Sequence, residues 1–377
     1  MRTVVLHFLL GVRLAAAELA VHEWGTFTSV VGSDGRMLSG LEVEEERVPA
    51  FVHSFPSFVP LAKGLSLPLR GVTVKMETPV LYFYSAVPRE VSVRVAFAGG
   101  SISQWYPERS GGEAAPQVAT LDFARGYRGS AAWRVEVLAP DTTEKINTPR
   151  HLETPQWPRA RVPGANLVRG PKDEIEGFIF YRGLGDLALP LQISATDGRM
   201  TLRNSGTQEI PFLCVYEKRP ADAEGQLWLG GALAASARVE APLAVRRDRL
   251  VRFSDRLQAF AEALQRAGLS ADEAKAMLAT WRESYFERPG LRVFWIVPRG
   301  LTDAILPLEI TPRPDKLERV LVGRAEVLTP AFEAEIARGF AHDGGKRWTA
   351  DRYFRAYRER ARQLGVTVGV APPARTP

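Results

Sequence analysis

The sequence has a single cysteine and no apolar run long enough to cross a membrane. Because Cys214 stands alone, no intramolecular disulfide can form, and its apolar neighbours predict a small core residue rather than a nucleophile. A transmembrane helix requires about 20 consecutive apolar residues, whereas the apolar run near the start covers only residues 4–12. Neither a disulfide-stapled scaffold nor a transmembrane helix is therefore expected.

The sequence also lacks the motifs that identify common enzyme classes. It has no HExxH zinc motif, no GxSxG nucleophile elbow, no Walker A loop, no CxxC pair and no dinucleotide-binding fingerprint. Histidine is scarce as well, since only positions 22, 53, 151 and 342 carry it beyond residue 20. The easily recognised enzyme classes are excluded, but an enzyme whose residues converge from distant strands is not.

Positive charge is in excess only at the C-terminal end. The formal net charge is +6, and residues 345–377 hold eight basic and two acidic side chains, which accounts for the whole excess. A nucleic-acid-binding domain normally carries its charge across its main body, so no nucleic-acid partner is expected. A helix at residues 350–364 then has two interpretations: peripheral contact with an anionic membrane, or, as we favour, packing through an apolar stripe with solvated arginines.

The first 20 residues predict an export signal. Arg2 precedes the apolar run at residues 4–12, and alanines follow at 15–17, in the order of the n-, h- and c-regions of a signal peptide. A buried first helix or strand is the alternative, because a histidine and an arginine interrupt the apolar stretch. We expect a secreted or periplasmic protein that begins near Glu18 or Val21 and has no transmembrane segment after signal removal.

Alternation of apolar and polar residues predicts strands over the first two-thirds of the chain. Val91, Val93 and Val95 share one face, and the glycines at 99–100 predict a hairpin into residues 101–106. Residues 200–215 resemble an immunoglobulin-like hairpin. Further strands are expected at residues 79–85, 131–138, 177–182, 189–196, 211–218, 226–229, 291–297, 304–310 and 319–328.

The periodicity becomes helical at Ser254. Ser270 and Glu273 form a capping box for the second helix of a helical hairpin, while Thr329 with its following proline and Thr349 predict the starts of two C-terminal helices. The predicted fold class is mainly β with α: two antiparallel β-sandwich-like units, a helical hairpin insertion and a helical C-terminus.

These elements divide the chain into five predicted parts. They are a signal peptide at residues 1–20, an N-terminal β unit at 21–138, a Pro-rich connection at 139–173, a second β unit at 174–328 with the helical hairpin inserted at 254–287, and C-terminal helices with a tail at 329–377.

Histidine and carboxylate side chains are the candidates for catalysis, because together they can move protons. The candidates are His22, Glu23, His53, His151 and Glu153. Alternation along a strand places His22 and Glu23 on opposite faces, so a regular strand does not let them chelate one ion. No histidine spacing matches a metal site, and we expect neither a metal nor another cofactor.

Aromatic side chains near turns and strand ends are the candidates for ligand binding. Their rings stack on sugar rings and on bases, although large aromatic residues more often form the core. The candidates are Trp24, Trp105, Tyr106 and Trp157.

Four segments together resemble a group of exported bacterial proteins. They are His22–Thr28 (HEWGTFT), Lys75–Tyr84 (KMETPVLYFY), Phe180–Gly183 (FYRG) and Trp295–Arg299 (WIVPR). The resemblance covers nearly the whole chain after residue 20. It implies export and a β-rich body of two parts, and it brings no activity and no catalytic residues.

The sequence therefore favours a non-enzymatic exported β-sandwich protein that binds a glycan, a cell-envelope component or another protein. The alternative is a secreted hydrolase or metal-dependent enzyme with a loop-borne histidine and carboxylate site. A cleft that gathers three or more of the histidine and carboxylate candidates would favour the enzyme. A cleft lined by aromatic and amide side chains would favour binding.

Overall fold

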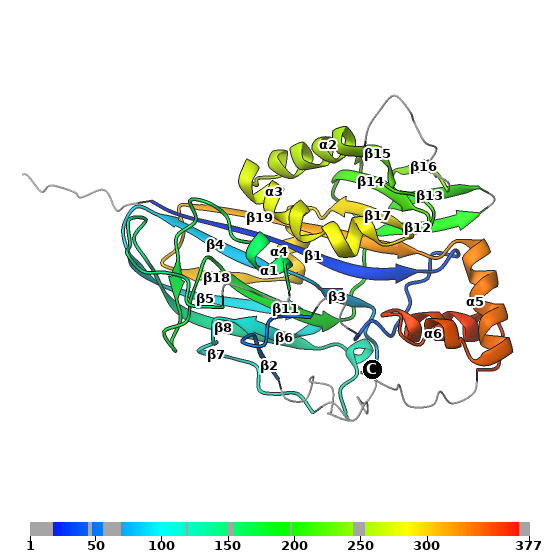
Figure 1. The fold of residues 1–377 in the computed structure, drawn as a ribbon, viewed down its shortest axis with the longest axis horizontal. Helices are drawn as coiled ribbons and strands as arrows, with labels where there is room; N and C mark the ends of the chain where they lie inside the picture. Colours follow the sequence, from blue (N-terminus) through cyan, green and yellow to red (C-terminus); the bar gives the residue numbers. More distant parts are fainter. Residues whose placement is uncertain are drawn as a thin grey trace, which may run out of the picture.

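The computed structural model describes residues 18–43, 47–55, 69–117, 120–149, 154–196, 198–243 and 253–368. In these ranges the strands form three sheets, and helices lie over one face and at one end (Figure 1). The predicted class of a mainly β protein with helices is confirmed. Residues 1–17 of the predicted signal peptide lie outside the described residues.

The largest sheet contains ten strands within the described ranges. Its order is β15 (Gln226–Leu233), β14 (Ile210–Lys218), β17 (Gly290–Ile296), β19 (Lys316–Val327), β1 (Leu19–Val31), β3 (Val74–Met76), β11 (Ile179–Gly185), β6 (Gly100–Tyr106) and β2 (His53–Ser54), with β4 (Val80–Ser85) paired to β1 and β11. β1 and β19 run parallel, from Ala20 opposite Lys316 to Val31 opposite Val327. Segments about 300 residues apart in the sequence thus form the centre of this sheet.

Two smaller sheets cover one face of the large sheet. The first contains β10 (Ile175–Glu176), β9 (Val168–Arg169), β8 (Arg128–Val137), β5 (Arg89–Ala98) and β18 (Leu308–Thr311), with β7 (Gly111–Gly112) paired to β8. The second contains β12 (Leu191–Thr196), β13 (Arg199–Asn204) and β16 (Arg238–Pro242). Side chains from all three sheets form one continuous apolar core, as in a β-sandwich.

Strand β1 is buried on both faces, which explains its central position. Val21 and Phe27 point into the core between the sheets, whereas Trp24 points into a second apolar cluster on the opposite, helix-covered face. A strand that is covered on both faces has few exposed positions and a nearly continuous apolar sequence. In β1, 12 of the 13 residues are buried.

The two predicted β units share the large sheet. Strands β1, β3, β4 and β6, from residues 21–138, lie in it beside β14, β17 and β19, from residues 174–328, and the β1–β19 pair is parallel rather than antiparallel. The two predicted hairpins are wrong, because β5 and β6 lie in different sheets, as do β13 and β14. β6 is largely buried on both faces, which suits the interior of the large sheet, whereas β5 alternates between buried and more exposed positions.

Helices cover the second face of the large sheet and one end of the molecule (Figure 1). The described helices are α1 (Gln156–Arg159), α2 (Phe253–Arg266), α3 (Ala271–Thr280), α4 (Arg299–Ile305), α5 (Pro330–Asp343) and α6 (Phe354–Gln363), with a π-helical turn at Arg282–Glu287 and 3₁₀ turns at Phe123–Arg125 and Lys346–Trp348. Helices α1, α2 and α3 lie on the second face, α5 and α6 lie at the end, and α4 packs on the core between the sheets. The predicted helical hairpin is present as α2 and α3. The expected strand at 304–310 is in part α4, because this segment packs one side on the sheets through Ile305.

The start of α3 joins the helical hairpin to the large sheet. The predicted capping box is present: the Ser270 hydroxyl accepts from the Glu273 amide at 3.2 Å, and the Glu273 carboxylate accepts from the Ser270 amide at 2.6 Å. The same carboxylate accepts from the Tyr84 hydroxyl at 2.8 Å and lies 2.9 Å from Nδ1 of His22. One fully buried side chain therefore caps a helix and binds two strands.

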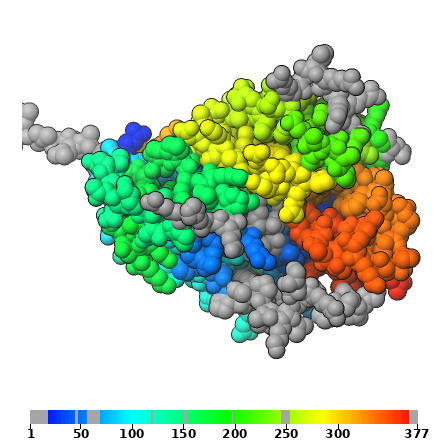
Figure 2. Space-filling view, viewed as in Figure 1, coloured from blue at the N-terminus to red at the C-terminus, as the bar shows by residue number. Residues whose placement is uncertain are grey.

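The C-terminal helices form a third apolar cluster at one end of the molecule (Figure 2). Thr329 caps α5 as predicted, but α6 begins at Phe354 rather than directly after Thr349, because turns and a bend occupy residues 349–353. Arg360 is buried on α6, and its Nε donates to Glu333 Oε1 at 2.7 Å.

Helix α6, which corresponds to the basic helix expected at residues 350–364, thus packs against the rest of the protein and is not exposed to solvent on all sides. Ala356, Tyr357 and Ala361 are buried, and Arg355 forms an ion pair with Glu42. This arrangement agrees with the favoured interpretation, in which α6 packs through its apolar stripe, except that some of its arginines are paired rather than solvated. No helix in the described part of the chain is long and apolar enough to span a membrane.

Replacing Glu273 by glutamine is expected to lower the free energy of unfolding by about 1.5–3 kcal/mol, because a buried carboxylate loses its charge-assisted hydrogen bonds. Burial raises the pKa of Glu273, but hydrogen bonds with His22, the Ser270 amide and Tyr84 outweigh it and hold the pKa below its ordinary 4.5. A lowered folded-state pKa stabilises the fold above pH 4.5, and this stabilisation is lost as the pH falls through the folded-state pKa.

Urea unfolding at a series of pH values from neutral to acid checks this prediction. The difference in stability between the wild type and Glu273→Gln should shrink as the pH falls below 4.5. Glu262→Gln, an exposed position on α2, is the matched control and should leave the profile unchanged. A difference that stays constant with pH would contradict the assigned role of the carboxylate.

Candidate functional site

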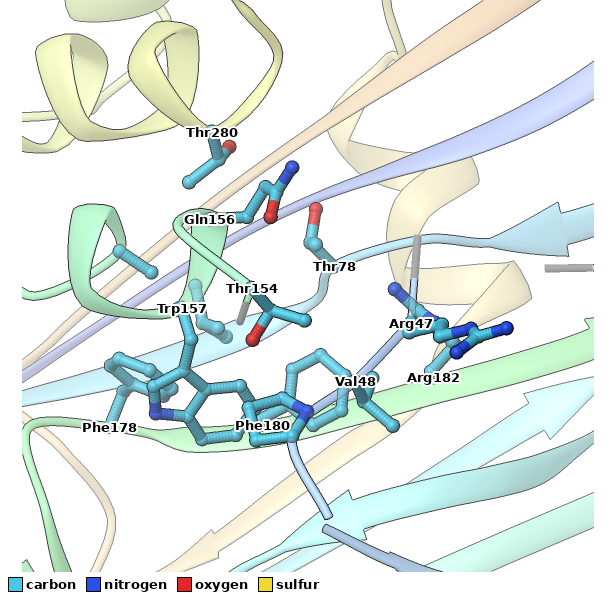
Figure 3. Close-up of a pocket in the computed structure, with 13 residues that line it drawn as sticks. Arg47, Val48, Thr78, Thr154, Gln156, Trp157, Phe178, Phe180, Arg182 and Thr280 are labelled. Carbon is cyan, nitrogen blue, oxygen red and sulfur yellow. The ribbon is translucent and has the colours of Figure 1, made fainter. Parts of the chain in front are cut away.

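A recess opens on the helix-covered face of the large sheet, among α1, β11 and the end of α3 (Figure 3). It contains about 400 Å³ of space between protein atoms and is partly open to solvent. We call it the aromatic recess. Its apolar walls are formed by Val48, Pro49, Val80, Trp157, Ala160, Phe178 and Phe180, and its polar groups belong to Arg47, Thr78, Thr154, Gln156, Arg182 and Thr280.

A buried carboxylate holds Trp157 in the wall of this recess. The indole Nε1 donates to Glu176 Oε2 at 2.8 Å, and Arg161 donates to both oxygens of Glu176 at 3.0 Å. The Trp157 ring centroid lies 5.3 Å from that of Phe178 and 5.1 Å from that of Phe180. The Pro-rich connection therefore contributes a rigid aromatic surface, because a bidentate Arg–carboxylate pair fixes the segment that carries it.

Two buried hydroxyl groups in the recess have no hydrogen-bond partner. They are Oγ1 of Thr78 and Oγ1 of Thr154, and Figure 3 shows both threonines and Gln156 around the same space. A buried polar atom without a partner costs about 1–3 kcal/mol, so such atoms are rare in folded proteins and call for an explanation. Groups of this kind suit a ligand whose own polar atoms complete the hydrogen bonds.

Arginines lie at one end of the recess. Arg182 is buried, its Nε donates to the carbonyl of Glu77 at 2.8 Å, and its guanidinium lies 5.8 Å from the centre of the Phe180 ring. Arg47 is exposed at the rim and lies at the same end in Figure 3. The Phe180 contact and the Glu77 hydrogen bond fix the position of the Arg182 charge.

A smaller recess lies on the other side of Arg182. Lys75 and Glu77 line it as a buried ion pair with 3.2 Å between Nζ and Oε1, and Lys75 also donates to the carbonyl of Val43 at 3.0 Å. Glu42 lines the same recess and pairs with Arg355. Both described carboxylates of this smaller recess are thus paired with other cations.

Strand β1 supports the turn that carries Thr78. The Glu77 amide donates to the carbonyl of Thr26 at 2.8 Å. At the neighbouring position, a Cβ on Gly25 would lie 2.9 Å from Cα of Pro79, so only glycine lets the turn approach this closely. Two of the four segments that carry the resemblance, those beginning at Lys75 and Phe180, thus contribute residues to the aromatic recess, and the segment beginning at His22 supports the turn that carries Thr78.

The three candidates among the described residues, His22, Glu23 and His53, do not gather in the recess. His22 faces Glu273 on the helix-covered side, while Glu23 accepts from Arg319 Nε at 2.6 Å on the other side. The prediction that His22 and Glu23 lie on opposite faces is confirmed. His151 and Glu153 lie outside the described residues.

His53 lies between two carboxylates at the edge of the large sheet. Its Nε2 is 2.6 Å from Glu174 Oε1, its Nδ1 is 3.5 Å from Glu108 Oε2, and its ring stacks on Tyr106. Burial raises the pKa of Glu108, but hydrogen bonds from Lys172 and Trp105 and the charge of His53 outweigh it and lower this pKa. None of these groups lines the aromatic recess. Within the described ranges, no group of three or more His, Cys, Asp or Glu side chains is arranged to hold a metal ion.

The aromatic candidates divide into one recess residue and three core residues. Trp157 lines the recess. Tyr106 packs against Trp157, with 5.7 Å between the centroids of the two rings. Trp105 is buried against Phe55, and Trp24 is completely buried.

Sequence reasoning missed the other recess residues that matter. They are Thr78, Thr154, Gln156, Phe178, Phe180 and Arg182. Thr78 and Arg182 do lie within the segments quoted for the resemblance. They are polar residues in or beside strands that are otherwise apolar, and this pattern could have marked them as site residues.

A wider groove runs along α2 and α3 and has a different character. It contains about 1810 Å³ of space open to solvent, and Leu257, Ala261 and Leu278 are among its apolar lining residues. In the described ranges, the buried polar atoms without partners belong to residues outside this groove. We therefore place the candidate site in the aromatic recess.

Comparison with known proteins gives only remote likeness. No protein-family model matches the chain, and no curated protein does. The yeast delta-COP-I mu-homology domain complexed with a Dsl1 WxWxV peptide is 6% identical, with 83% of this chain and 98% of that chain covered and a TM-score of 0.27. The same yeast domain alone is 7% identical, with 83% and 97% covered and a TM-score of 0.26. Likeness at these TM-scores carries no argument about function.

Replacing Thr78 or Thr154 by valine is expected to leave the free energy of unfolding unchanged or to raise it by up to about 1 kcal/mol, since each change removes a buried hydroxyl without a partner. Thr280→Val in the same recess is the matched control, because the Thr280 hydroxyl donates to the Met277 carbonyl at 2.7 Å. That control should lose about 0.5–1.5 kcal/mol. Urea unfolding measures all three, and a clear loss of stability in Thr78→Val or Thr154→Val would contradict the prediction.

Proposed function

We propose that the chain is a non-catalytic binding protein that holds one sugar ring of a glycan in the aromatic recess. The observation that carries the proposal is the pairing of aromatic walls with buried hydroxyls that lack partners, at Thr78 and Thr154. A sugar ring presents an apolar face to aromatic side chains and hydroxyl groups to polar ones, so this combination suits it.

The composition of the recess favours binding over catalysis. Among the described residues, its lining contains three threonines, a glutamine and two arginines, and no histidine or carboxylate. General acid–base hydrolysis of a glycosidic bond requires a pair of carboxylic acids that flank the bond. The described part of the lining offers no such pair, which supports the binding protein over the alternative of a secreted hydrolase.

The cell envelope is the proposed place of action. The signal peptide expected at residues 1–20 would deliver the protein to the periplasm or the exterior, where envelope glycans are the ligands within reach. A protein partner is the second possibility for an exported binding protein, but unpaired hydroxyls around a small recess suit a sugar ring better than a flat protein surface.

The proposal predicts that the purified protein binds a glycan on an array of envelope and plant polysaccharide fragments and leaves it uncleaved. Gln156→Ala and Thr154→Val should each weaken that binding about tenfold, which corresponds to one hydrogen bond of about 1.4 kcal/mol. Isothermal titration calorimetry measures the affinity, and mass spectrometry of the glycan after incubation detects cleavage.

Gln265→Ala is the matched control, because Gln265 lines the groove along α2 and α3 instead of the recess. It should leave the affinity unchanged. If Gln265→Ala loses binding while Gln156→Ala and Thr154→Val keep it, the binding site lies in the groove and not in the recess. Cleavage of the glycan would contradict the proposed function and favour the hydrolase.

A further inference from the structure

We infer that the protonated side chain of His53 fixes one wall of the aromatic recess, and that this wall loosens when the imidazole loses its proton. The wall belongs to the segment 47–55, which contains β2 and supplies Arg47, Val48 and Pro49 to the lining. The inference concerns the protein's own wall, so it goes beyond the proposed function and applies to any ligand of the recess.

The segment 47–55 connects the recess to the edge of the large sheet. Its strand β2 pairs with β6 over two residues, at the end of the described strand order. Between β2 and the recess, the ring of Phe51 packs edge-on against Trp157, with 5.2 Å between the centroids. A strand with so few backbone hydrogen bonds opens easily. Side-chain contacts of β2 therefore decide how firmly the wall is held.

His53, the first residue of β2, makes such contacts with two other segments. Its Nε2 lies 2.6 Å from Glu174 Oε1, and its Nδ1 lies 3.5 Å from Glu108 Oε2. A neutral imidazole has one N–H and one nitrogen with a lone pair, whereas the protonated ring has two N–H groups. Only the protonated ring therefore presents a proton to both carboxylates, and its loss turns one attraction into a repulsion.

The two carboxylates are also joined to each other. Glu174 Oε2 accepts from the backbone amide of Glu108 at 2.6 Å, and Lys172 Nζ donates to Glu108 Oε2 at 2.8 Å. Glu174 thus holds both His53 and the turn that carries Glu108. The acceptors are fixed by these contacts, so the imidazole is the part of this cluster that can let go of the segment 47–55.

The neighbouring groups keep their charge where histidine titrates, which is between about pH 5 and 8. Burial raises the pKa of Glu108, but hydrogen bonds and the charge of His53 outweigh it and hold this pKa below 4.5. The hydrogen bond to Glu108 raises the pKa of Lys172, and burial raises that of Tyr106, on which His53 stacks. Arg109 stays charged and lies over two aromatic rings, 4.6 and 4.3 Å from their centres.

The direction of the pH effect follows. Glu108 is charged above pH 4.5, so the contact with a protonated His53 is present from there upward. It is lost as the pH rises through the range in which histidine ordinarily titrates. The wall is therefore firm in mildly acidic solution and loosened in mildly alkaline solution.

Hydrogen exchange of the full chain, followed by mass spectrometry, tests the inference without a ligand. Exchange rates are measured between about pH 6 and 8.5 and divided by the intrinsic rate at each pH, because histidine loses its charge in this range. Protection of residues 50–55 in the wild type should fall about three- to fivefold, the effect of one partly exposed ion pair. Residues 316–327 of β19 are the internal reference and should keep their protection.

His53→Gln is the test variant, because glutamine keeps a hydrogen-bonding side chain without a charge. Its residues 50–55 should exchange at every pH as the wild type does at the alkaline end. His342→Gln removes an exposed histidine on α5 and is the matched control, which should follow the wild type. Glu174→Gln is a second variant and should also reduce the pH dependence, because it removes one of the two negative charges.

Two results would overturn the inference. One is a wild-type protection of residues 50–55 that does not change with pH. The other is a change that persists in His53→Gln or that appears equally in β19, since it would then come from another group or from global stability. Neither result bears on glycan binding, and a protein that binds no glycan but shows the pH response would overturn the proposed function alone.

Discussion

The parallel pairing of β1 with β19 is the constraint on which the rest of the structure depends. It joins residues 20–31 to residues 316–327 over twelve consecutive pairs and places β1 at the centre of a ten-stranded sheet. The carbonyl of Thr26 on this strand accepts from Glu77, and Gly25 leaves room for Pro79, so the turn that carries Thr78 is positioned by β1. The candidate site therefore requires that two segments distant in the sequence are already paired.

Because side chains alternate along β1, neighbouring residues of this strand lie on opposite faces of the large sheet. One face carries a buried ion pair, and the other is the helix-covered face. Glu23 points between the sheets, where Arg319 and Tyr181 satisfy both of its oxygens. His22 points to the other side and contacts Glu273, which anchors the helical hairpin that forms one border of the recess. A buried charge is stable only when it is paired and hydrogen-bonded, and both carboxylates meet that condition. These charged groups are therefore committed to the fold, whereas the hydroxyls of Thr78 and Thr154 in the recess have no hydrogen-bond partner.

The recess could be predicted from the sequence only in part. Trp157 was a candidate because aromatic rings near turns and strand ends can stack on a ligand, and it does line the recess. Gln156 and Thr154 stand beside it in the sequence, but nothing local distinguishes them from ordinary loop residues. Arg182 lies on β11, and Thr78 lies on the turn between β3 and β4. Long-range pairing sets the neighbours of these strands in the sheet, so the approach of the two residues to α1 has no local signal. His53 with Glu108 and Glu174 shows the same limit, since three separate segments supply one cluster.

The sequence by itself determined the local elements and their faces. The capping box at Ser270 and Glu273, the Thr329 cap and the opposite faces of His22 and Glu23 all follow from spacings of a few residues, because helix caps and strand alternation are local interactions. Only the tertiary structure decided which strands share a sheet. It placed β5 and β6 in different sheets although two glycines join them, and it brought β1 and β19 together in parallel. The physical reason is that partner choice depends on apolar area buried across the whole chain, which no short pattern records.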